Sequence, residues 1–313
     1  MRALVTGAAG FIGSTLARRL RGEGLDVTGV DSFTDYYDQA LKRSNAADVA
    51  RAGARLLEVD LNIADLDELL DGIDVIFHLA GQPGVRASWG SEFAAYTQSN
   101  ISATQRLLEA VRGRNRIQRF VFASSSSVYG NAERYPTTER DRPQPVSPYG
   151  VTKLAAEHLC TLYATNFGIP TVSLRYFTVY GPGQRPDMAF TRFAKAAVRG
   201  EDIHVFGTGE QVRDFTYVDD VVEANLLAAT TDVAPGSVFN VAGGSHASVN
   251  CVLGILEELA GNPLSVTRGD PIPGDVTRTG GDTTAIRSIM GWQPRIGLRE
   301  GLGRQLAWAS ESD

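Results

Sequence analysis

The sequence contains little cysteine. Its 313 residues include two, Cys160 and Cys251, which both lie in apolar surroundings of helical pattern. Because neither has neighbours at a metal-ligand spacing, we expect core thiols in a reducing compartment and no bound metal. The chain also lacks a signal-peptide pattern after Met1 and any run near the roughly 20 apolar residues that would span a bilayer. These absences predict a soluble, cytoplasmic protein with no membrane partner.

An excess of basic charge is absent as well. The 30 Lys and Arg residues are outnumbered by 36 Asp and Glu residues, so the net charge is −6 and nucleic acid is not expected as a partner. The hydrophobic fraction of 43% and the charged fraction of 21% are usual for a globular protein. The length suits one large domain or two moderate ones.

The first half of the chain alternates short apolar runs with longer amphipathic stretches such as residues 93–114. The apolar runs, which predict buried strands, lie at 2–7, 25–31, 54–60, 74–80, 119–125 and 170–176. Runs with little polar alternation, separated by helices, indicate a parallel sheet covered on both faces. We therefore expect an α/β fold with a doubly wound parallel sheet of the Rossmann type.

A glycine-rich turn lies between the first predicted strand and the first helix. Gly7, Gly10 and Gly13 follow the spacing G-x-x-G-x-x-G, which lets the backbone turn tightly and approach a pyrophosphate at a helix N-terminus. Asp31 ends the second strand, where a carboxylate accepts hydrogen bonds from ribose hydroxyls and repels a 2′-phosphate. The sequence thus predicts NAD, rather than NADP, as the cofactor.

The alternation of apolar runs and helices ends after Thr178, where a Gly/Pro-rich loop is followed by a pattern of mixed short strands and helices. We expect residues 1–178 to form the NAD-binding domain and residues 179–313 a smaller, mixed α/β lobe that binds the substrate. Some of the later chain, at about 214–244, is expected to return to the first domain.

The ends of the third and fourth predicted strands hold further candidate residues. Asp60 and Leu61 close the third strand, where an adenine edge could be met, and His78 closes the fourth. We interpret His78 as a packing residue rather than an acid or base.

A tyrosine and a lysine share one face of a later helix. Ser147 suits the N-cap and Pro148 the first helical position, so the helix should start there. Tyr149 and Lys153 are then i and i+4 neighbours, and the ammonium would lower the tyrosine pKa. Tyr149 is therefore a candidate base for an alcohol proton.

Taken together, the glycine turn, Asp31, "SSSSVYG", the Y-x-x-x-K pair, "RYFTVYGP" and "RDFTYVDD" resemble the extended short-chain dehydrogenase/reductases. Within that family they are similar to the nucleotide-sugar epimerases and dehydratases. The resemblance covers essentially the whole chain. It implies that bound NAD is recycled, that Tyr149 takes the proton of the sugar C4 hydroxyl with help from Lys153, and that Ser125 holds this hydroxyl, with Ser126 as the alternative register. It implies NAD contacts at Gly7, Gly10, Phe11, Ile12, Gly13, Asp31, Asp60, Leu61, Leu79, Ala80, Tyr149, Lys153 and Tyr176.

The residue types at positions 126 and 127, both serine in this chain, differ between the enzymes of this group. Dehydratases of the family usually carry Asp-Glu at the positions of Ser126 and Ser127, and decarboxylases a glutamate at the second of them. Epimerisation needs only oxidation, rotation and reduction of the sugar, which suits neutral hydroxyls.

The loop "RYFTVYGPGQRPDMA" resembles that of the UDP-glucuronate 4-epimerases, as does "GQPGVRASW", which contains Arg86. The resemblance implies that Arg185 grips the sugar carboxylate as a two-pronged ion pair, with hydroxyl contacts from Thr178, Ser126 and Ser127. Such a grip would suppress loss of CO₂ from the 4-keto uronate, which is a β-keto acid.

The nucleotide end of the substrate is assigned by the same resemblance. Phe206 would stack on uracil, Arg213 and Arg278 would neutralise the diphosphate, and Asp275 would accept from a ribose hydroxyl. The family also implies a homodimer formed through long helices.

These features favour an NAD-dependent UDP-glucuronate 4-epimerase. The alternatives are a 4-epimerase of a neutral UDP- or dTDP-hexose or N-acetylhexosamine, a dehydratase or decarboxylase of the family, and a non-catalytic NAD-binding regulator.

Overall fold

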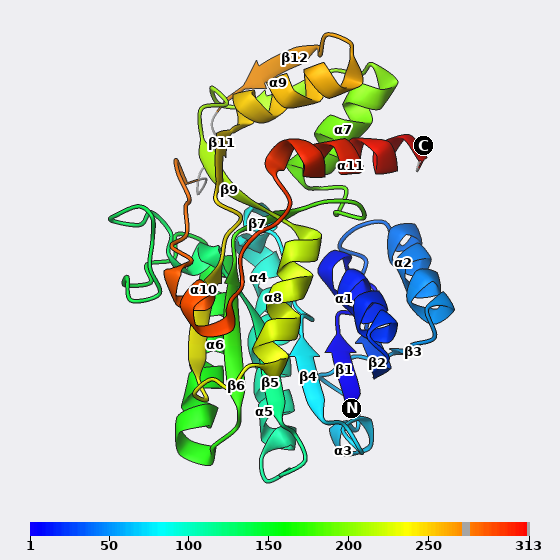
Figure 1. The fold of residues 1–313 in the computed structure, drawn as a ribbon, viewed down its shortest axis with the longest axis vertical. Coiled ribbons are helices and arrows are strands. Elements are labelled where there is room, and N and C mark those ends of the chain that lie inside the picture. The colour runs from blue at the N-terminus through cyan, green and yellow to red at the C-terminus, as the bar shows by residue number, and fades with distance from the viewer. Residues whose placement is uncertain (271–275, 312–313) are drawn as a thin grey trace.

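The computed structural model of the protein describes residues 1–270 and 276–311. Its main element is a seven-stranded parallel sheet in the order β10-β6-β5-β4-β1-β2-β3 (Figure 1). The strands of this sheet are β1 (Arg2–Thr6), β2 (Asp26–Asp31), β3 (Arg55–Glu58), β4 (Val75–His78), β5 (Arg119–Ser125), β6 (Thr171–Tyr176) and β10 (Ser237–Val241). The first six coincide with the six predicted apolar runs, so the doubly wound fold is confirmed.

Alternate residues of the strands face two separate helical layers. Leu4, Ile76 and Phe120 belong to one buried cluster, while their neighbours Ala3 and Phe77 belong to another. Helices of the first cluster are α3 (Leu66–Leu69), α5 (Ala103–Val111) and α6 (Pro148–Phe167); those of the second include α1 (Phe11–Gly22), α2 (Gln39–Arg51) and α8 (Val218–Thr230). Burial on both faces explains why the strands are apolar throughout rather than alternating.

The stretch 93–114, expected as one helix, is helical but not uniform. It consists of α4 (Phe93–Tyr96), a π-helical segment η3 (Thr97–Ser102) and then α5. Short 3₁₀ turns precede it, η1 (Arg86–Ser88) and η2 (Gly90–Glu92), and a third, η4 (Ser126–Val128), follows β5. π-Helical segments within α-helices are frequent at functional sites.

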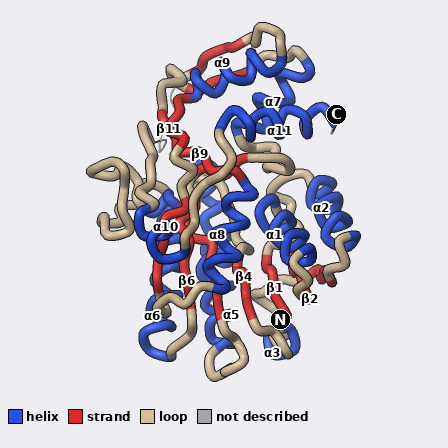
Figure 2. The backbone as a smooth tube through the Cα atoms, viewed as in Figure 1, coloured by secondary structure: helices blue, strands red, loops and turns tan. Residues whose placement is uncertain are grey.

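Most of the remaining elements form a smaller part above the carboxyl ends of the large sheet (Figure 1). A three-stranded sheet contains β7 (Thr178–Tyr180), β9 (Val212–Tyr217) and β11 (Ser245–Ser248), and a two-stranded sheet contains β8 (Ile203–Phe206) and β12 (Val266–Gly269). The helices of this part are α7 (Ala189–Arg199), α9 (Val249–Ala260) and α11 (Leu298–Glu311), whereas α10 (Thr284–Met290) lies beside the large sheet (Figure 1). Figure 2 shows loop segments running between this part and the large sheet.

The chain after Thr178 contributes to both parts of the molecule. Strand β10 lies at the edge of the large sheet, α8 packs on β5 and β6, and α10 packs on β10. The division into residues 1–178 and 179–313 stays a prediction.

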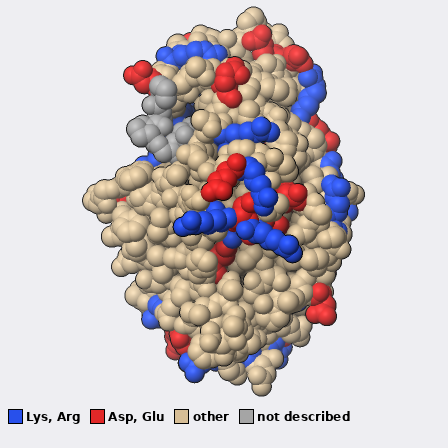
Figure 3. Space-filling model, turned by 90° about the vertical axis from the view of Figure 1, so that its left-hand side faces the viewer, with Lys and Arg blue, Asp and Glu red and all other residues tan. Residues whose placement is uncertain are grey.

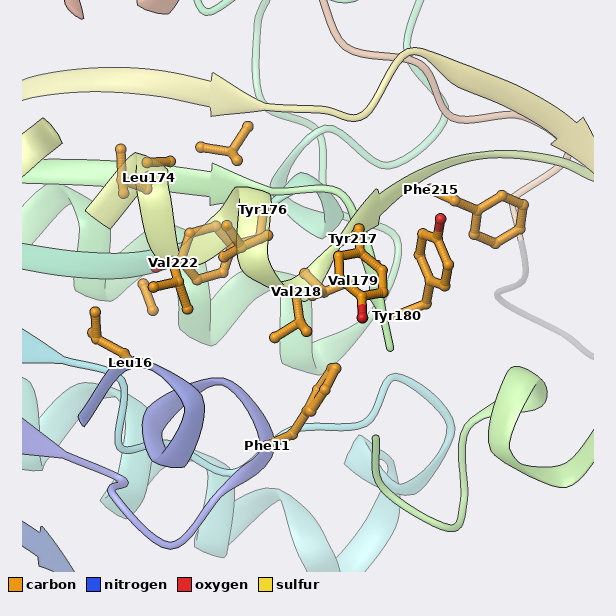
Figure 4. Packing of buried hydrophobic residues seen from close by; sticks show 14 of the residues in the cluster. Phe11, Leu16, Leu174, Tyr176, Val179, Tyr180, Phe215, Tyr217, Val218 and Val222 are labelled. Atoms are coloured by element: carbon orange, nitrogen blue, oxygen red, sulfur yellow. The ribbon is translucent and has the colours of Figure 1, made fainter. Parts of the chain in front are cut away.

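One apolar cluster joins the large sheet to the smaller part. Phe11 of α1 and Tyr176 of β6 lie in the same cluster as Tyr180 of β7, Phe215 of β9 and Leu302 of α11. Figure 4 shows labelled members of this cluster on β6, β7 and β9 following one another, with Phe11 and Leu16 of α1 to one side of them. The two parts therefore share a single core.

The expectation of two core thiols holds for one cysteine. Cys160 on α6 is buried, whereas Cys251 on α9 is exposed. Cys251 lies on the solvent side of an amphipathic helix, where its amide is held by the N-cap Ser248 at 3.1 Å, so the prediction was wrong for this residue. Among the described residues, no helix combines the length and hydropathy needed to cross a membrane.

Candidate functional site

The carboxyl ends of the strands border a cavity of 240 Å³. Gly7 follows β1, Asp31 ends β2, Leu79 follows β4, Ser124 lies in β5 and Tyr176 ends β6, and all five side chains or backbones line it. Every cofactor residue named in the sequence analysis lies in this lining. The strand order reverses between β1 and β4, which is where ligands of such sheets bind.

The glycine turn is packed too closely for side chains. Gly7 has a φ of 72°, and a Cβ on it would lie 2.9 Å from the amide nitrogen of Ala80. A Cβ on Gly13 would overlap the backbone of Gly7, and the Gly10 amide donates to the Gly7 carbonyl at 3.0 Å. The resulting bare rim at the start of α1 fits the pyrophosphate of a dinucleotide.

Asp31 is held in place by backbone amides. Its carboxylate accepts hydrogen bonds from Ala9 N at 3.1 Å and from Phe33 N at 2.9 Å. Lys42 of α2 lies 3.9 Å away, is buried, and donates to the Thr34 carbonyl at 2.9 Å. Burial lowers the pKa of Lys42. Sequence reasoning missed this lysine, because a single lysine in a helix is usually a solvated side chain.

His78 has a structural role, as expected. Its Nδ1 is 2.8 Å from the Thr6 hydroxyl and its Nε2 is 2.9 Å from the Thr104 hydroxyl, in a fully buried position. Burial, assisted by the charge of Lys153, lowers the pKa of His78 to about 3. The ring is therefore neutral and joins β1, β4 and α5.

Helix α6 begins where the sequence predicts. The Ser147 hydroxyl accepts from the Gly150 amide at 3.1 Å and Pro148 is the first helical residue. Burial raises the pKa of Tyr149, while a hydrogen bond with Ser125 and the charge of Arg185 lower it. The net effect is a raised pKa, because burial outweighs the effects of Ser125 and Arg185, so the prediction that Lys153 lowers the pKa of Tyr149 was wrong.

Lys153 lies in an apolar setting at the same cavity. Its Nζ is 4.6 Å from the centroid of the Phe122 ring, and burial lowers its pKa to about 8 against the opposing effects of Cys160 and Glu157. A lysine in this setting carries a charge that is easily lost or regained near neutral pH.

Strand β5 ends in Ser124 and Ser125, and Ser126 and Ser127 follow in η4, half-buried; of these four serines, only Ser124 belongs to the cavity lining. Ser125 hydrogen-bonds Tyr149 and its hydroxyl accepts from the Ser127 amide at 3.1 Å. This contact supports Ser125 over Ser126 as the residue beside the candidate base. Ser124, which sequence reasoning left without a role, lines the cavity and donates to Glu157 at 2.6 Å.

Glu157 belongs to a buried polar network that starts behind these serines. Arg175 donates to Glu157 at 2.6 and 3.0 Å and to the Tyr129 hydroxyl at 2.6 Å. Tyr129 donates to Asn240 at 2.8 Å. The network connects β5, α6, β6 and β10.

The proposed substrate residues fall into two groups. Arg185 lines the cavity with the cofactor residues, and Thr178 is half-buried at the start of β7. Farther out, the Arg86 guanidinium carbon lies 4.7 Å from the centroid of the Phe206 ring, so the ring proposed to stack on uracil already faces an arginine.

The residues assigned to the diphosphate lie on adjacent segments. Arg278 pairs with Val212 beside Arg213 in a short parallel bridge. The Arg278 guanidinium lies 5.2 Å from the Tyr135 ring centroid, and Arg213 donates to the Val212 carbonyl at 2.9 Å. Asp275 lies outside the described residues.

The π-helical segment also supplies a cavity residue that was missed. Asn100 accepts from the Gln82 amide at 2.7 Å and donates to the Thr152 hydroxyl at 3.0 Å. A buried asparagine in an otherwise amphipathic stretch was the available signal. Tyr36 and Tyr37, from the loop between β2 and α2, line the cavity as well.

Charge is mixed on the face that Figure 3 displays, with Lys and Arg next to Asp and Glu across its middle. That face has no continuous basic surface, in keeping with the net charge of −6. Across residues 1–270 and 276–311, no group of three or more His, Cys, Asp or Glu side chains could hold a metal ion.

Comparisons with known proteins give a consistent result. The model of the NAD dependent epimerase/dehydratase family matches residues 3–242. The crystal structure of UDP-glucuronic acid 4-epimerase from Bacillus cereus with UDP-glucuronic acid and NAD superposes with a TM-score of 0.96, at 40% identity and with 100% of both chains covered. The uncharacterized UDP-glucose epimerase YtcB of Bacillus subtilis is 43% identical over 99% of this chain and 98% of its own. UDP-glucuronate 4-epimerase 2 of Arabidopsis thaliana is 37% identical over 97% of this chain and 75% of its own.

Proposed function

The chain belongs to the NAD-dependent epimerase/dehydratase family, and on that premise we propose that it interconverts UDP-glucuronate and UDP-galacturonate by epimerisation at C4 of the sugar. One observation carries the proposal. Arg185 lines the same cavity as Tyr149 and Lys153, so a cation suited to a sugar carboxylate lies beside the candidate base.

The cavity fits NAD. The side-chain-free glycine rim suits the pyrophosphate, and Asp31, fixed by Ala9 and Phe33, suits the ribose hydroxyls. When bound, NAD supplies a hydride acceptor that later returns the hydride to the opposite face of the sugar.

In the proposed mechanism the protein moves one proton. The Tyr149 phenolate takes the proton of the C4 hydroxyl, which Ser125 orients by a hydrogen bond, and returns it after the sugar has rotated. Lys153 keeps positive charge near the phenolate. Ser126 and Ser127 follow Ser125 where a dehydratase would have acids, so they leave C5 untouched.

Arg185 would hold the C6 carboxylate during rotation. A two-pronged ion pair fixes the plane of a carboxylate, and the 4-keto sugar loses CO₂ only when the C5–C6 bond lies parallel to the π orbitals of the C4 carbonyl. Thr178 and the two serines would add hydroxyl contacts.

The experiment is incubation of the purified protein with UDP-glucuronate, followed by proton NMR of the sugar C4 proton. We expect conversion to UDP-galacturonate. If UDP-glucuronate is unchanged while UDP-glucose is epimerised, the uronate assignment is wrong and the reaction type stands.

A neutral UDP-hexose is the second candidate substrate. It is favoured by the Bacillus subtilis relative, whose name is that of a UDP-glucose epimerase. Including UDP-glucose in the same NMR assay decides between the two.

Assembly and location are proposed separately. The outer face of α6 exposes Val151 and Leu162, at 47% and 54%, and we propose that this face pairs in a homodimer located in the cytoplasm. Sedimentation should give twice the mass of one chain, and Leu162→Glu should give monomers. A wild-type monomer at micromolar concentration would contradict the dimer.

A further inference from the structure

The guanidinium of Arg185 is held along one edge. Its Nε donates to Asp187 Oδ1 and its Nη2 to Asp187 Oδ2, both at 2.9 Å. A guanidinium has five N–H donors and can meet carboxylates along two edges. Asp187 takes the Nε–Nη2 edge, so the Nη1–Nη2 edge can meet a second carboxylate.

Asp187 is held in turn by Tyr36. The Tyr36 hydroxyl donates to Asp187 and lies beside the Tyr96 hydroxyl, which donates to the Gly84 carbonyl at 2.8 Å. Gly84 has a φ of 102°, and a Cβ there would collide with the Tyr36 hydroxyl. The loops after β2, after β4 and before α7 thus meet at one carboxylate.

This assembly lies next to the candidate base. The Tyr96 ring packs edge-on against the Tyr149 ring with centroids 6.2 Å apart, and the Arg185 guanidinium carbon lies 5.9 Å from the Tyr36 ring centroid. Arg185, Tyr36 and Tyr149 all line the cavity. The orientation of Arg185 is therefore set beside the reacting carbon of any sugar bound at Tyr149.

We propose that Asp187, anchored by Tyr36, is a positioning residue that turns the Nη1–Nη2 edge of Arg185 toward the sugar carboxylate and thereby selects a uronate and protects it from decarboxylation. The inference rests on the proposed function. Asp187 acts through Arg185 and does not itself contact the sugar.

The ion pair between Arg185 and Asp187 also affects substrate binding. Asp187 compensates the charge of Arg185 and so weakens its long-range attraction for a substrate carboxylate. The carboxylate of Asp187 instead fixes the direction in which the Nη1–Nη2 edge of Arg185 points. Loss of the Asp187 carboxylate should therefore impair protection of the 4-keto uronate from decarboxylation more than it weakens substrate binding.

Release of CO₂ from the 4-keto uronate would show that the sugar carboxylate is no longer held in a fixed orientation. In a 4-keto uronate the C5–C6 bond can break, its electron pair passing to the C4 carbonyl, with release of CO₂ and uptake of a proton at C5. The product is a 4-keto pentose nucleotide. A freely turning arginine should allow this alignment, whereas a fixed one prevents it.

The test compares Asp187→Asn with wild type, using UDP-glucuronate labelled with carbon-14 in the carboxyl group. Asparagine keeps the shape, but its amide nitrogen faces a guanidinium donor, so the two-pronged pair is lost. We expect kcat for epimerisation to fall by about tenfold or more, KM to stay equal or fall, and released CO₂ to rise. The matched control is Asp48→Asn, an acid paired with Arg51 outside the cavity, which should behave as wild type.

Several outcomes would overturn the inference. Unchanged kcat and CO₂ release in Asp187→Asn would do so, and so would a raised KM without extra CO₂, which indicates mere loop damage. Tyr36→Phe, which keeps the ring and removes the hydroxyl, should shift kcat and CO₂ in the same direction by a smaller factor. If Asp187→Asn does not fold, Tyr36→Phe decides alone. If wild type leaves UDP-glucuronate unchanged, the proposed function has failed, which is a separate result.

Discussion

At the scale of single residues, the hydroxyl of Tyr149 stands between two opposing influences. Burial raises its pKa, whereas Ser125 and Arg185 lower it. A phenol in this position is costly to ionise without a nearby positive charge, and Lys153 and Arg185 both border the cavity. Its chemistry therefore depends on neighbours from three separate elements.

Tyr149→Phe should reduce kcat by about 10²- to 10⁴-fold, since it removes the acid–base group. Retained NAD is expected, because the glycine turn is untouched, and absorbance after gel filtration measures it. Tyr163→Phe, on the same helix but outside the cavity lining, is the control and should keep wild-type kcat. Normal turnover by Tyr149→Phe would exclude it as the base.

Asp31 and Lys42 together predict the choice of dinucleotide. Asp31→Asn keeps an acceptor for one of the Ala9 and Phe33 amides, which bond different oxygens of the carboxylate, and removes the negative charge, leaving Lys42 as the nearby charge. The preference for NAD over NADP should fall by about tenfold or more, ~1.4 kcal/mol. Titration of both dinucleotides by calorimetry measures it, with Glu58→Gln, an exposed acid at the end of β3, as the control. An unchanged ratio would show that Asp31 does not discriminate.

At the scale of elements, the buried pair of Arg175 and Glu157 joins β6 to α6. The side chains are 5% and 3% exposed, and Ser124 and Tyr129 satisfy further donors and acceptors. Removing one partner from a buried pair leaves an unpaired charge, which is much more costly than losing a surface pair.

Glu157→Gln should therefore lower the free energy of unfolding by about 3–5 kcal/mol. Urea denaturation followed by circular dichroism measures the change. The control is Glu258→Gln, whose pair with Arg299 is largely exposed and should matter by less than about 0.5 kcal/mol. Equal effects of the two substitutions would contradict a structural role for the network.

The sequence predicted the strands and helices themselves better than the contacts that they make with one another. Continuous apolar runs predicted the buried strands, and Ser147 with Pro148 predicted the start of α6. Lys42 and Tyr36 could not be found in this way. Their positions depend on how loops from distant segments pack, and a lysine or tyrosine of the same local sequence is usually solvated. Cys251 was misplaced for a related reason, because apolar neighbours in sequence do not determine which side of a helix is covered.

At the scale of the whole molecule, stability should depend on pH through His78. Its pKa is about 3 in the folded protein and about 6.5 when unfolded. The unfolded chain thus binds more protons between these values, and stability is lost as pH falls below about 6.5. From pH 7 to pH 5 the free energy of unfolding should drop by about 2 kcal/mol from this group.

Urea denaturation at several pH values checks this slope. His78→Asn should be less stable overall, since Thr6 and Thr104 lose a partner, but its stability should fall less steeply over this range. An identical slope in both proteins would show that other groups cause the pH dependence.

The shared apolar core limits how ligands can enter. A hinge motion that swung the smaller part away from the large sheet would have to separate Tyr180 and Phe215 from Phe11 and Tyr176 within one cluster. Exposing that surface costs about 25 cal/mol per Å². Ligands should instead enter and leave the cavity beneath the loops that Tyr36 and Asp187 connect. A crosslink between those loops would then trap a bound cofactor, while one across the shared core would leave its exchange rate unaltered.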